Sequence, residues 1–399
     1  MLEIIFNGLF WFSAIFLIWT YAGYPAFLVL LSPLLKKHHY LNQRFFPKVT
    51  LMIMSYNEEK SIIKKIENTL ELDYPKDKLE IFIVDSASTD NTKRIVKNFI
   101  RKHKKTGIRL IAQPKREGKA SGINFGMKHA SGEIIMITDA NAMLSKNAVK
   151  NIVRHFDDQK VGGVCGRFEA RDIKGTSVGA GGEMYWKIEQ MLRRGESNLD
   201  SCIHMSGEIT AVRKDLLKEV DTTSLAEDFD MAVSIRKAGK RIIYEPFAIA
   251  YEPAPTNIED LKMQKRRIVT GTLQVLKKYW YMLFNLRYGF YGFMILTSHK
   301  LFQLLTPFVL ALFVIATIGL YFIAFTGFMH LVVVVEITGI IFGILSFFLT
   351  KTDVFKHNKA LNFVKYFLAS NWIVVMGWID FIKGKKIVKW EKIESSREF

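Results

Sequence analysis

Residues 132–144 read GEIIMITDANAML, and this stretch decides the fold class that the sequence predicts. Four strand-forming apolar residues lead to Thr138, and Asp139, Ala140 and Asn141 follow before the chain turns apolar again. A carboxylate at the end of a parallel strand lies where open α/β sheets bind their ligands. Asp and Asn also favour helix caps and turns, so the surrounding sequence has to decide between a ligand and a turn residue.

Three similar apolar runs precede this stretch and alternate with helical segments. Strands are predicted over 49–55, 80–85 and 108–113, because continuous apolar runs of this length are typical of strands buried on both faces. Alternating strands and helices favour an α/β fold with a doubly wound, mostly parallel sheet, in which functional loops follow the strand ends. Polar residues fill these loops at Tyr56 to Glu58, Asp85, and Asp139 to Asn141.

The remaining soluble part of the chain is predicted in less detail. A helix is expected from Asn57 to about Leu72, and the cap-forming residues 88–92 start another. The later elements are expected as strands over 161–168 and 208–213 and as helices over 183–194, 227–238 and 258–279.

The chain combines an excess of charge with an excess of apolar residues. Of its 399 residues, 49% are hydrophobic, while the formal net charge is +18. The uncharged runs 4–35 and 301–335 are long enough to cross a bilayer, which takes about 20 apolar residues. Four membrane spans are predicted, at about 8–31, 301–324, 330–350 and 362–383.

These features predict five regions along the chain. They are an N-terminal transmembrane helix within 1–40, a cytosolic domain over 45–280, an interfacial helix over 286–300, C-terminal transmembrane helices over 301–384 and a basic tail over 385–399. Flanking lysines favour a multi-pass protein of the cell membrane with its soluble domain in the cytoplasm. Four spans would place the basic tail outside, so either one span is interfacial or the positive-inside rule is broken.

Several function classes find little support in the sequence. No base-reading motif accompanies the basic charge, so nucleic-acid binding is not expected. Cys165 and Cys202 have no metal-ligand spacing with His and are interpreted as buried thiols in a reducing compartment. A membrane transporter or scaffold with a nucleotide-binding domain is the alternative from another class, although transporters commonly contain internal repeats. Snorkelling explains the charges of Lys365 and Asp380 beside a predicted span.

Six short motifs stand in a fixed order along the chain. They are SYNEE (55–59), VDSASTDNT (84–92), GKASGINFG (118–126), TDANAML (138–144), AEDFDMAVSIRKAGKRI (226–242) and QKRRI (264–268). In order and approximate spacing they resemble the motifs of membrane-bound family 2 glycosyltransferases, the relatives of cellulose, chitin and hyaluronan synthases. The resemblance covers nearly the whole chain, since SHKLFQLLTP (298–307) is also similar to that branch. It implies the GT-A fold, a Rossmann-like doubly wound sheet.

The resemblance also implies how a nucleotide-sugar would be bound. Tyr56, Glu58 and Asp85 would line the nucleoside pocket, with Asp85 accepting a hydrogen bond from the uracil ring of a UDP-sugar. Lys119, at a helix start between glycines, would contact the diphosphate as a point charge. Asp139 would also face the diphosphate.

The resemblance also implies that a divalent cation is bound. Asp139 and Asn141 take the place of the family's D-x-D pair, whose oxygens bind Mn²⁺ or Mg²⁺. Asn141 supplies an uncharged amide oxygen, so a lower metal affinity is expected.

The acid in AEDFD resembles the family's general base. One carboxylate near the acceptor hydroxyl is what an inverting single displacement needs, and Asp228 is the predicted base. Glu227 and Asp230 are close rivals, because the first turn of a helix attracts acidic residues in any case.

The QKRRI segment matches the family's Q-x-x-R-W motif except at its last position. Gln264, Arg266 and Arg267 would bind the diphosphate, while Ile268 replaces the Trp that stacks on the acceptor sugar. Gly207 in SGEITAVRK, Glu227 and Ile268 are the predicted acceptor-side residues.

The sequence thus predicts a membrane-bound, metal-dependent inverting glycosyltransferase that moves a sugar from a UDP-sugar to a glycan or lipid-linked acceptor. The absence of the Trp favours a single addition, and a processive synthase that extrudes its polymer is the alternative. The sugar, the acceptor and the oligomeric state are left open.

Overall fold

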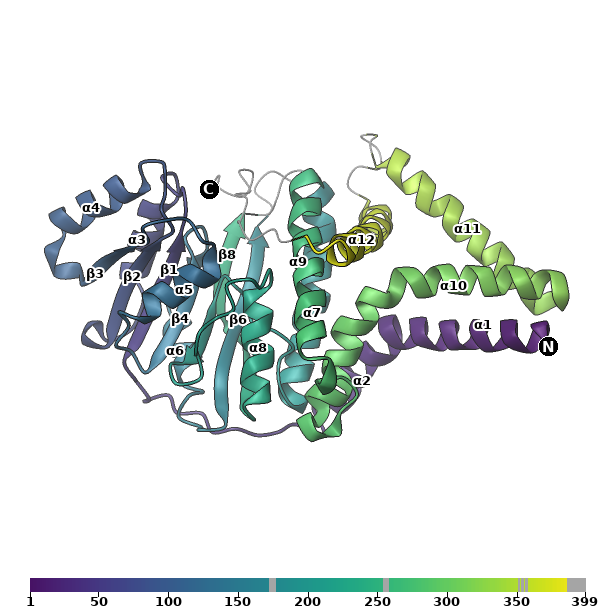
Figure 1. Ribbon diagram of the computed structural model, residues 1–399, viewed down its shortest axis with the longest axis horizontal. Helices are drawn as coiled ribbons and strands as arrows, with labels where there is room; N and C mark the ends of the chain where they lie inside the picture. The colour runs from purple at the N-terminus through teal and green to yellow at the C-terminus, as the bar shows by residue number, and fades with distance from the viewer. Residues whose placement is uncertain (172–176, 254–257, 351, 353–354, 356–357, 386–399) are drawn as a thin grey trace.

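A mixed sheet is joined through two upright helices to a group of long apolar helices in the computed structural model of the protein (Figure 1). The structure describes residues 1–171, 177–253, 258–350, 352, 355 and 358–385. Residues 386–399, most of the predicted basic tail, lie outside the described part.

Eight strands form one sheet in the order β3-β2-β1-β4-β7-β6-β8-β5. Strands β3, β2, β1 and β4 pair with one another in parallel, and so do β6 and β8. Strand β7 pairs antiparallel with β4 and β6, and β5 pairs antiparallel with β8. This arrangement confirms the predicted α/β class. The strands are β1 (Val49–Ser55), β2 (Leu79–Asp85), β3 (Ile108–Ala112), β4 (Ile134–Asp139), β5 (Met143–Leu144), β6 (Val161–Arg171), β7 (Thr210–Arg213) and β8 (Arg241–Pro253).

Alternate residues of the central strands supply two separate cores. Successive side chains of a strand point to opposite faces, so both faces of an apolar strand need a cover. Met52 and Met54 of β1 pack with α5 (Lys119–Met127) and α8 (Glu227–Lys237). On the other face, Ile53 packs with α3 (Ile62–Leu70) and α4 (Thr92–Lys102), and Leu51 packs with α6 (Ala148–Val153).

Two long helices, α7 (Ser177–Leu199) and α9 (Ile258–Lys278), stand between the sheet and the apolar helices (Figure 1). Helix α7 contacts β6, β8 and α2, and α9 contacts α8 and α12. The two helices therefore connect the sheet domain to the rest of the chain.

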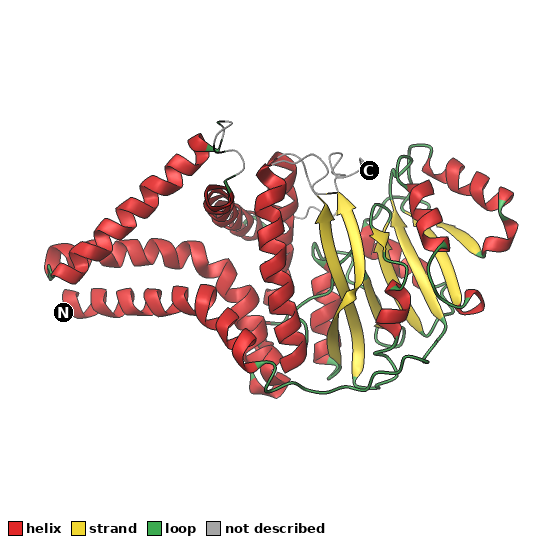
Figure 2. Ribbon diagram, turned by 180° about the vertical axis from the view of Figure 1, so that it is seen from behind, coloured by secondary structure: helices red, strands yellow, loops and turns green. Residues whose placement is uncertain are grey.

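Three helical segments are long and apolar enough to cross a membrane. They are Leu2–Leu31, built from α1 (Leu2–Ile18), a π-helical turn (Trp19–Gly23) and α2 (Tyr24–Leu31); Tyr291–Ile323, built from the π-helix η6 (Tyr291–Leu301) and α10 (Phe302–Ile323); and α11 (Gly327–Leu349). Helices α1 and α10 lie side by side in both views (Figure 2), where the rings of Phe10 and Phe313 stack with centroids 5.1 Å apart.

The fourth predicted span, 362–383, forms α12 (Lys359–Ile382) and is not among the apolar segments found in the described chain. It contacts α9 and α7, and in Figure 1 it is seen end-on while α1 and α10 run across the picture. The expectation of snorkelling for Asp380 is wrong, because its carboxylate is 2% exposed and pairs with Arg266 of α9.

Three local expectations differ from the structure. The helix expected from Asn57 begins at Ile62, because Asn57 adopts a left-handed conformation (φ 54°) and its side chain accepts a hydrogen bond from Thr89 N at 2.8 Å. Strand β8 is not predicted. The expected interfacial helix over 286–300 is instead a short turn followed by η6, which is largely buried and continues into α10.

Candidate active site

A buried ion pair occupies the carboxyl edge of the sheet. Lys119 opens α5 after Gly118, whose φ of 89° favours glycine. The Lys119 ammonium lies 2.5 Å from Asp139 Oδ1 and donates a hydrogen bond to the Gly207 carbonyl at 3.2 Å. Asp139 ends β4 as predicted. The structure therefore brings together three predicted site residues from α5, β4 and the loop before β7.

Gly207 allows the Lys119 ammonium to approach the backbone. A Cβ atom at Gly207 would lie 2.8 Å from Lys119 Nζ, closer than side chains tolerate. Burial disfavours the ammonium, but the carboxylates of Asp139 and Glu227 outweigh this effect and raise the pKa of Lys119. Glu227 lies 4.0 Å from the same nitrogen. Lys119 is thus a fixed cation enclosed by acidic groups.

Two further carboxylates that the sequence did not single out belong to this edge. Burial and the charges of Glu252 and Asp139 raise the pKa of Glu208 to about 8, while Lys119 opposes the shift. Glu252 lies on β8, an unpredicted strand, and for that reason was missed. Glu208 is part of the SGEITAVRK segment (206–214), which is the signal that could have identified it.

Lys65 is a second buried cation that the sequence did not suggest. It shares a helix face with Ile62, Ile66 and Thr69, all buried, and it donates hydrogen bonds to Thr138 Oγ1 at 2.9 Å and to the Ala142 carbonyl. Burial lowers its pKa to about 7, although Asp139 and Glu252 act in the opposite direction. Through these two hydrogen bonds Lys65 holds the turn that follows β4 in place.

The side chain of Asn141 has one partner and one orphaned atom. Its Nδ2 donates a hydrogen bond to Glu252 Oε1, which fixes the amide orientation, since a carboxylate oxygen accepts from the NH₂ group. Its Oδ1 is buried without a hydrogen-bond partner, which is rare for a buried polar atom. An oxygen left in this state beside Asp139 fits a cation ligand.

Within the described residues no group of three or more His, Cys, Asp and Glu side chains is arranged to hold a metal ion. Mg²⁺ nevertheless needs only one or two protein carboxylates when substrate phosphates complete its shell. Asp139 and Asn141 therefore fit a cation that binds together with a diphosphate.

The predicted nucleoside residues lie along the same edge. Strand pairing sets Ser55 beside Asp85 and Met54 beside Asp139, so the two aspartates are two strand spacings apart, about 10 Å. Arg116 stacks over the Tyr56 ring at 3.8 Å and donates a hydrogen bond to its hydroxyl at 3.2 Å. Arg116, three residues before Lys119, was not predicted.

Asp85 and Glu58 make contacts within the protein. Asp85 is fully buried, accepts a hydrogen bond from Ser88 N at 3.0 Å and lies 3.7 Å from Lys93 Nζ. Glu58 is buried, and its carboxylate accepts a hydrogen bond from Ser61 Oγ at 2.5 Å. Asp85 ends β2 and holds the backbone of the loop that follows, whereas Glu58 holds the hydroxyl of Ser61 at the start of α3.

The three acids of AEDFD separate clearly in the structure. Asp230 is buried and lies 2.9 Å from Lys278 Nζ. Asp228 is half-buried, and its Oδ1 accepts a hydrogen bond from the following Phe229 N at 2.8 Å. Burial raises the pKa of Glu227, with Lys119 opposing and Asp228 adding to the shift. The structure therefore brings Glu227 together with Lys119, whereas Asp230 is paired with Lys278.

Helix α9 places its two arginines on different sides. Arg266 pairs with Asp380 of α12, with 2.7 Å between Arg266 Nη2 and Asp380 Oδ1, so its guanidinium is held toward α12 in this structure. The charge of Arg267 acts on Glu227, which places Arg267 on the side of the site. Ile268 is 45% exposed, and Gln264 is half-buried on the same helix.

Comparison with known proteins assigns a family to the part of the chain that carries this geometry. Residues 50–221, which contain β1 to β4 and the Lys119–Asp139 pair, match the family described as Glycosyl transferase family 2. The chain therefore contains a glycosyl transferase family 2 domain.

Relatives of this chain include a glycosyltransferase and a polysaccharide synthase by name. The chain is 28% identical to "Probable glycosyltransferase YdaM" of Bacillus subtilis over 380 residues, 88% of each chain. It is 28% identical to the poly-beta-1,6-N-acetyl-D-glucosamine synthase of Staphylococcus epidermidis over 238 residues, which cover 58% of this chain and 56% of that synthase.

The fold is also similar to a solved structure. A mannosyltransferase of Pyrobaculum calidifontis, solved with GDP-Man and Mn²⁺, superposes with a TM-score of 0.71 at 23% identity. The match covers 96% of this chain and 100% of that one. It confirms the GT-A architecture of this chain.

Proposed function

We propose that this protein is a membrane-bound, inverting glycosyltransferase that transfers a sugar from a UDP-sugar to a glycan or lipid-linked acceptor. The observation that carries the proposal is the convergence of Lys119, Asp139, Gly207 and Glu227 at the carboxyl edge of the sheet. A fixed cation among acidic groups at such an edge is suited to a diphosphate that arrives with its own cation.

The donor would lie along this edge with its base toward Tyr56. The Arg116–Tyr56 stack offers a flat surface for the uracil ring, and the Asp85 carboxylate has lone pairs beyond those used by Ser88. At the other end, Lys119 would exchange part of its contact with Asp139 for the diphosphate, and Arg267 would add a second positive charge.

A divalent cation, Mn²⁺ or Mg²⁺, would be held by Asp139 and by the orphaned Oδ1 of Asn141. When bound, it would neutralise charge that develops on the departing diphosphate. Among the chain's own side chains, the ammonium of Lys119 would help to neutralise that negative charge.

Asp228 is the proposed general base. Its carboxylate would accept the proton of the acceptor hydroxyl as that oxygen attacks the anomeric carbon from the side opposite the diphosphate. A single displacement of this kind inverts the anomeric configuration. Glu227, closer to Lys119, would orient the acceptor, and Ile268 would leave the acceptor subsite without a stacking ring.

A processive synthase is the second candidate. The similarity to poly-beta-1,6-N-acetyl-D-glucosamine synthases favours it, whereas Ile268 favours single addition. The size of the product separates the two candidates.

The membrane arrangement that we propose has three spans. With the sheet domain in the cytoplasm, the segments Leu2–Leu31, Tyr291–Ile323 and α11 cross the membrane in turn. Helix α12 would lie at the cytoplasmic surface beside α9, which returns the basic C-terminal residues to the cytoplasm and satisfies the positive-inside rule.

The test uses the purified full-length protein in detergent or nanodiscs. UDP-glucose, UDP-N-acetylglucosamine, UDP-galactose and GDP-mannose are supplied with Mn²⁺ or Mg²⁺, and released nucleotide, product size and anomeric configuration are measured together. We expect release from a UDP-sugar only, with inversion. A protein that releases nucleotide from none of these donors, or whose Asp228→Asn variant transfers as fast as the parent, contradicts the proposal.

A further inference from the structure

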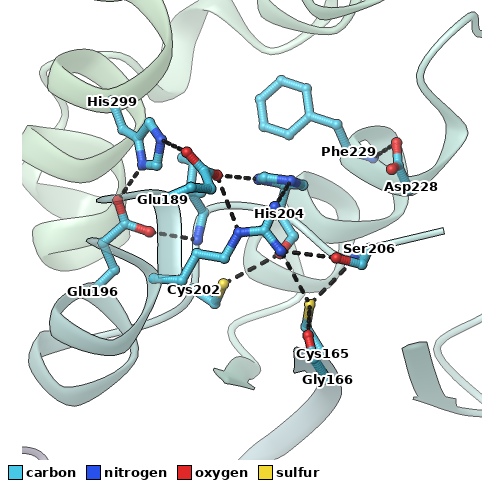
Figure 3. Close-up of polar contacts among 12 residues, drawn as sticks. Cys165, Gly166, Glu189, Glu196, Cys202, His204, Ser206, Asp228, Phe229 and His299 are labelled. Carbon is cyan, nitrogen blue, oxygen red and sulfur yellow. Dashed lines mark hydrogen bonds and ion pairs between the residues drawn. The ribbon is translucent and has the colours of Figure 1, made fainter. Parts of the chain in front are cut away.

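A network of buried charged side chains lies between α7 and η6, outside the residues discussed so far (Figure 3). Glu189, Arg193 and Glu196 follow one another on α7 at helical spacing, and each side chain is at most 3% exposed. His299 of η6 is fully buried between the two carboxylates, with Nε2 3.1 Å from Glu189 and Nδ1 2.5 Å from Glu196. Burying charges is costly unless every one is paired, so the network has a definite geometry.

The guanidinium of Arg193 reaches from this network to the loop before β7. Its Nε lies 3.1 Å from Glu189 Oε1, and its terminal nitrogens donate to Ser206 Oγ at 2.8 Å and to His204 Nε2 at 2.6 Å. Since Arg only donates, His204 accepts as a neutral ring; burial and the charge of Arg193 lower the pKa of His204 accordingly. Cys165 Sγ accepts from Ser206 N at 3.2 Å. Ser206 is therefore held from two sides.

The residue after Ser206 is part of the active site. The Gly207 carbonyl accepts from Lys119, and the Glu208 carbonyl accepts from Thr138 Oγ1 at 2.8 Å. The position of this loop thus sets the position of the Lys119 ammonium. In enzymes, misplacing a reacting group by about 1 Å can cost about 100-fold in rate.

The opposite end of the network is attached to two membrane segments. Glu196 also accepts from Tyr24 of α2 at 2.7 Å, and Trp19 Nε1 donates to Ser298 at 3.0 Å, next to His299. The polar contacts therefore run without a break from the first and second membrane segments to Ser206.

We propose that Arg193 is a positioning residue for the donor site and that His299 fixes Arg193 through Glu189. The inference rests on the proposed function. Arg193 touches no substrate; it holds the 204–208 loop, whose Gly207 carbonyl orients Lys119.

Full-length Arg193→Lys, Ser206→Ala and the double variant test the proposal. Lys keeps the buried positive charge but cannot reproduce the rigid fork of donors. We expect Arg193→Lys to lower kcat, counted per UDP-binding site, at least tenfold while the donor KM changes less than threefold. Ser206→Ala should act in the same direction, and the double variant should be no slower than Arg193→Lys. Amide hydrogen exchange at 204–208 should rise in Arg193→Lys and in His299→Gln.

The matched control is Arg236→Lys. Arg236 is also buried and donates to Asp200, to the Tyr288 carbonyl and to the Lys240 carbonyl, which lie outside residues 204–208. Its variant should therefore melt at a lower temperature with kcat within twofold of the parent. Two outcomes overturn this inference while leaving the proposed function intact, provided that the parent is active. One is an Arg193→Lys variant whose kcat stays within twofold of the parent, and the other is a double variant in which the two losses in kcat add. A parent that transfers no sugar refutes the proposed function and the inference with it.

Discussion

Replacing Gly207 with Ala tests the central ion pair with little disturbance of the fold. The new Cβ would lie 2.8 Å from Lys119 Nζ, so the ammonium must retreat by roughly 0.6 Å to restore an ordinary 3.4 Å contact. Because Nζ is the end of a flexible side chain, the shift is easy, and we expect the melting temperature to change by less than about 2 °C, below the shift for 1 kcal/mol. The same shift weakens the contacts of Lys119 with Asp139 and the Gly207 carbonyl.

The catalytic effect should be much larger than the effect on stability. A displacement of this size predicts a loss of about 10- to 100-fold in kcat/KM for the nucleotide-sugar. The assay follows nucleotide release by the full-length protein, with thermal unfolding measured on the same sample. Gly339→Ala is the control, because a Cβ there meets no atom within 4 Å. A Gly207→Ala enzyme with kcat/KM within twofold of the parent would refute the role assigned to Lys119.

Three other changes have defined outcomes. Asp228→Asn should lower kcat by about 10²- to 10⁴-fold with UDP affinity unchanged by calorimetry, and equal rates would exclude Asp228 as the base. Asn141→Ala should raise the Mn²⁺ concentration for half-maximal activity roughly tenfold, and an unchanged Mn²⁺ titration would remove Asn141 from the cation site. Glu245 is buried, which alone would raise its pKa, but hydrogen bonds from His155 at 2.8 Å and Arg154 at 2.5 Å outweigh burial and lower it. Its stabilisation is therefore present above the ordinary value of 4.5 and is lost as the pH falls through the lower folded value. Glu245→Gln should cost about 1.5–3 kcal/mol at pH 7 and flatten the acid-induced fall in melting temperature below pH 4.5, whereas parallel curves for variant and parent would contradict the assignment.

The sequence predicted the parallel half of the sheet closely. Strands at 49–55, 80–85 and 108–113 agree with the structure within about one residue, because apolar runs buried on both faces carry a strong signal. Strand β8 was missed because Glu245 and Pro246 interrupt its apolar run, and the strand tolerates them through an irregular register with β6.

The site was predicted where the chemistry is local to a strand end, as at Asp139 and Lys119. It was not predicted where the outcome depends on helix rotation. Arg266 and Arg267 are neighbours in sequence, but successive helical residues point about 100° apart, so one reaches Asp380 and the other the site. The sequence Arg266-Arg267 alone does not indicate which of the two side chains points toward the site.

Cys165 and Cys202 illustrate the same limit. Both are free and buried, as predicted. The contact of Cys165 with Ser206 depends on the return of the chain after α7, which no spacing in the sequence reveals.

The position of His299 has a practical consequence for anyone who works with this enzyme. A fragment trimmed to the sheet domain would retain Glu189 and Glu196 but lose the imidazole that lies between them. Glu189 would keep Arg193, but Glu196 would lose both His299 and, if α2 is also removed, Tyr24, so its buried carboxylate would need water. The smallest fragment that preserves the native interior therefore includes η6, which carries His299, even though the proposed active site lies at the carboxyl edge of the sheet.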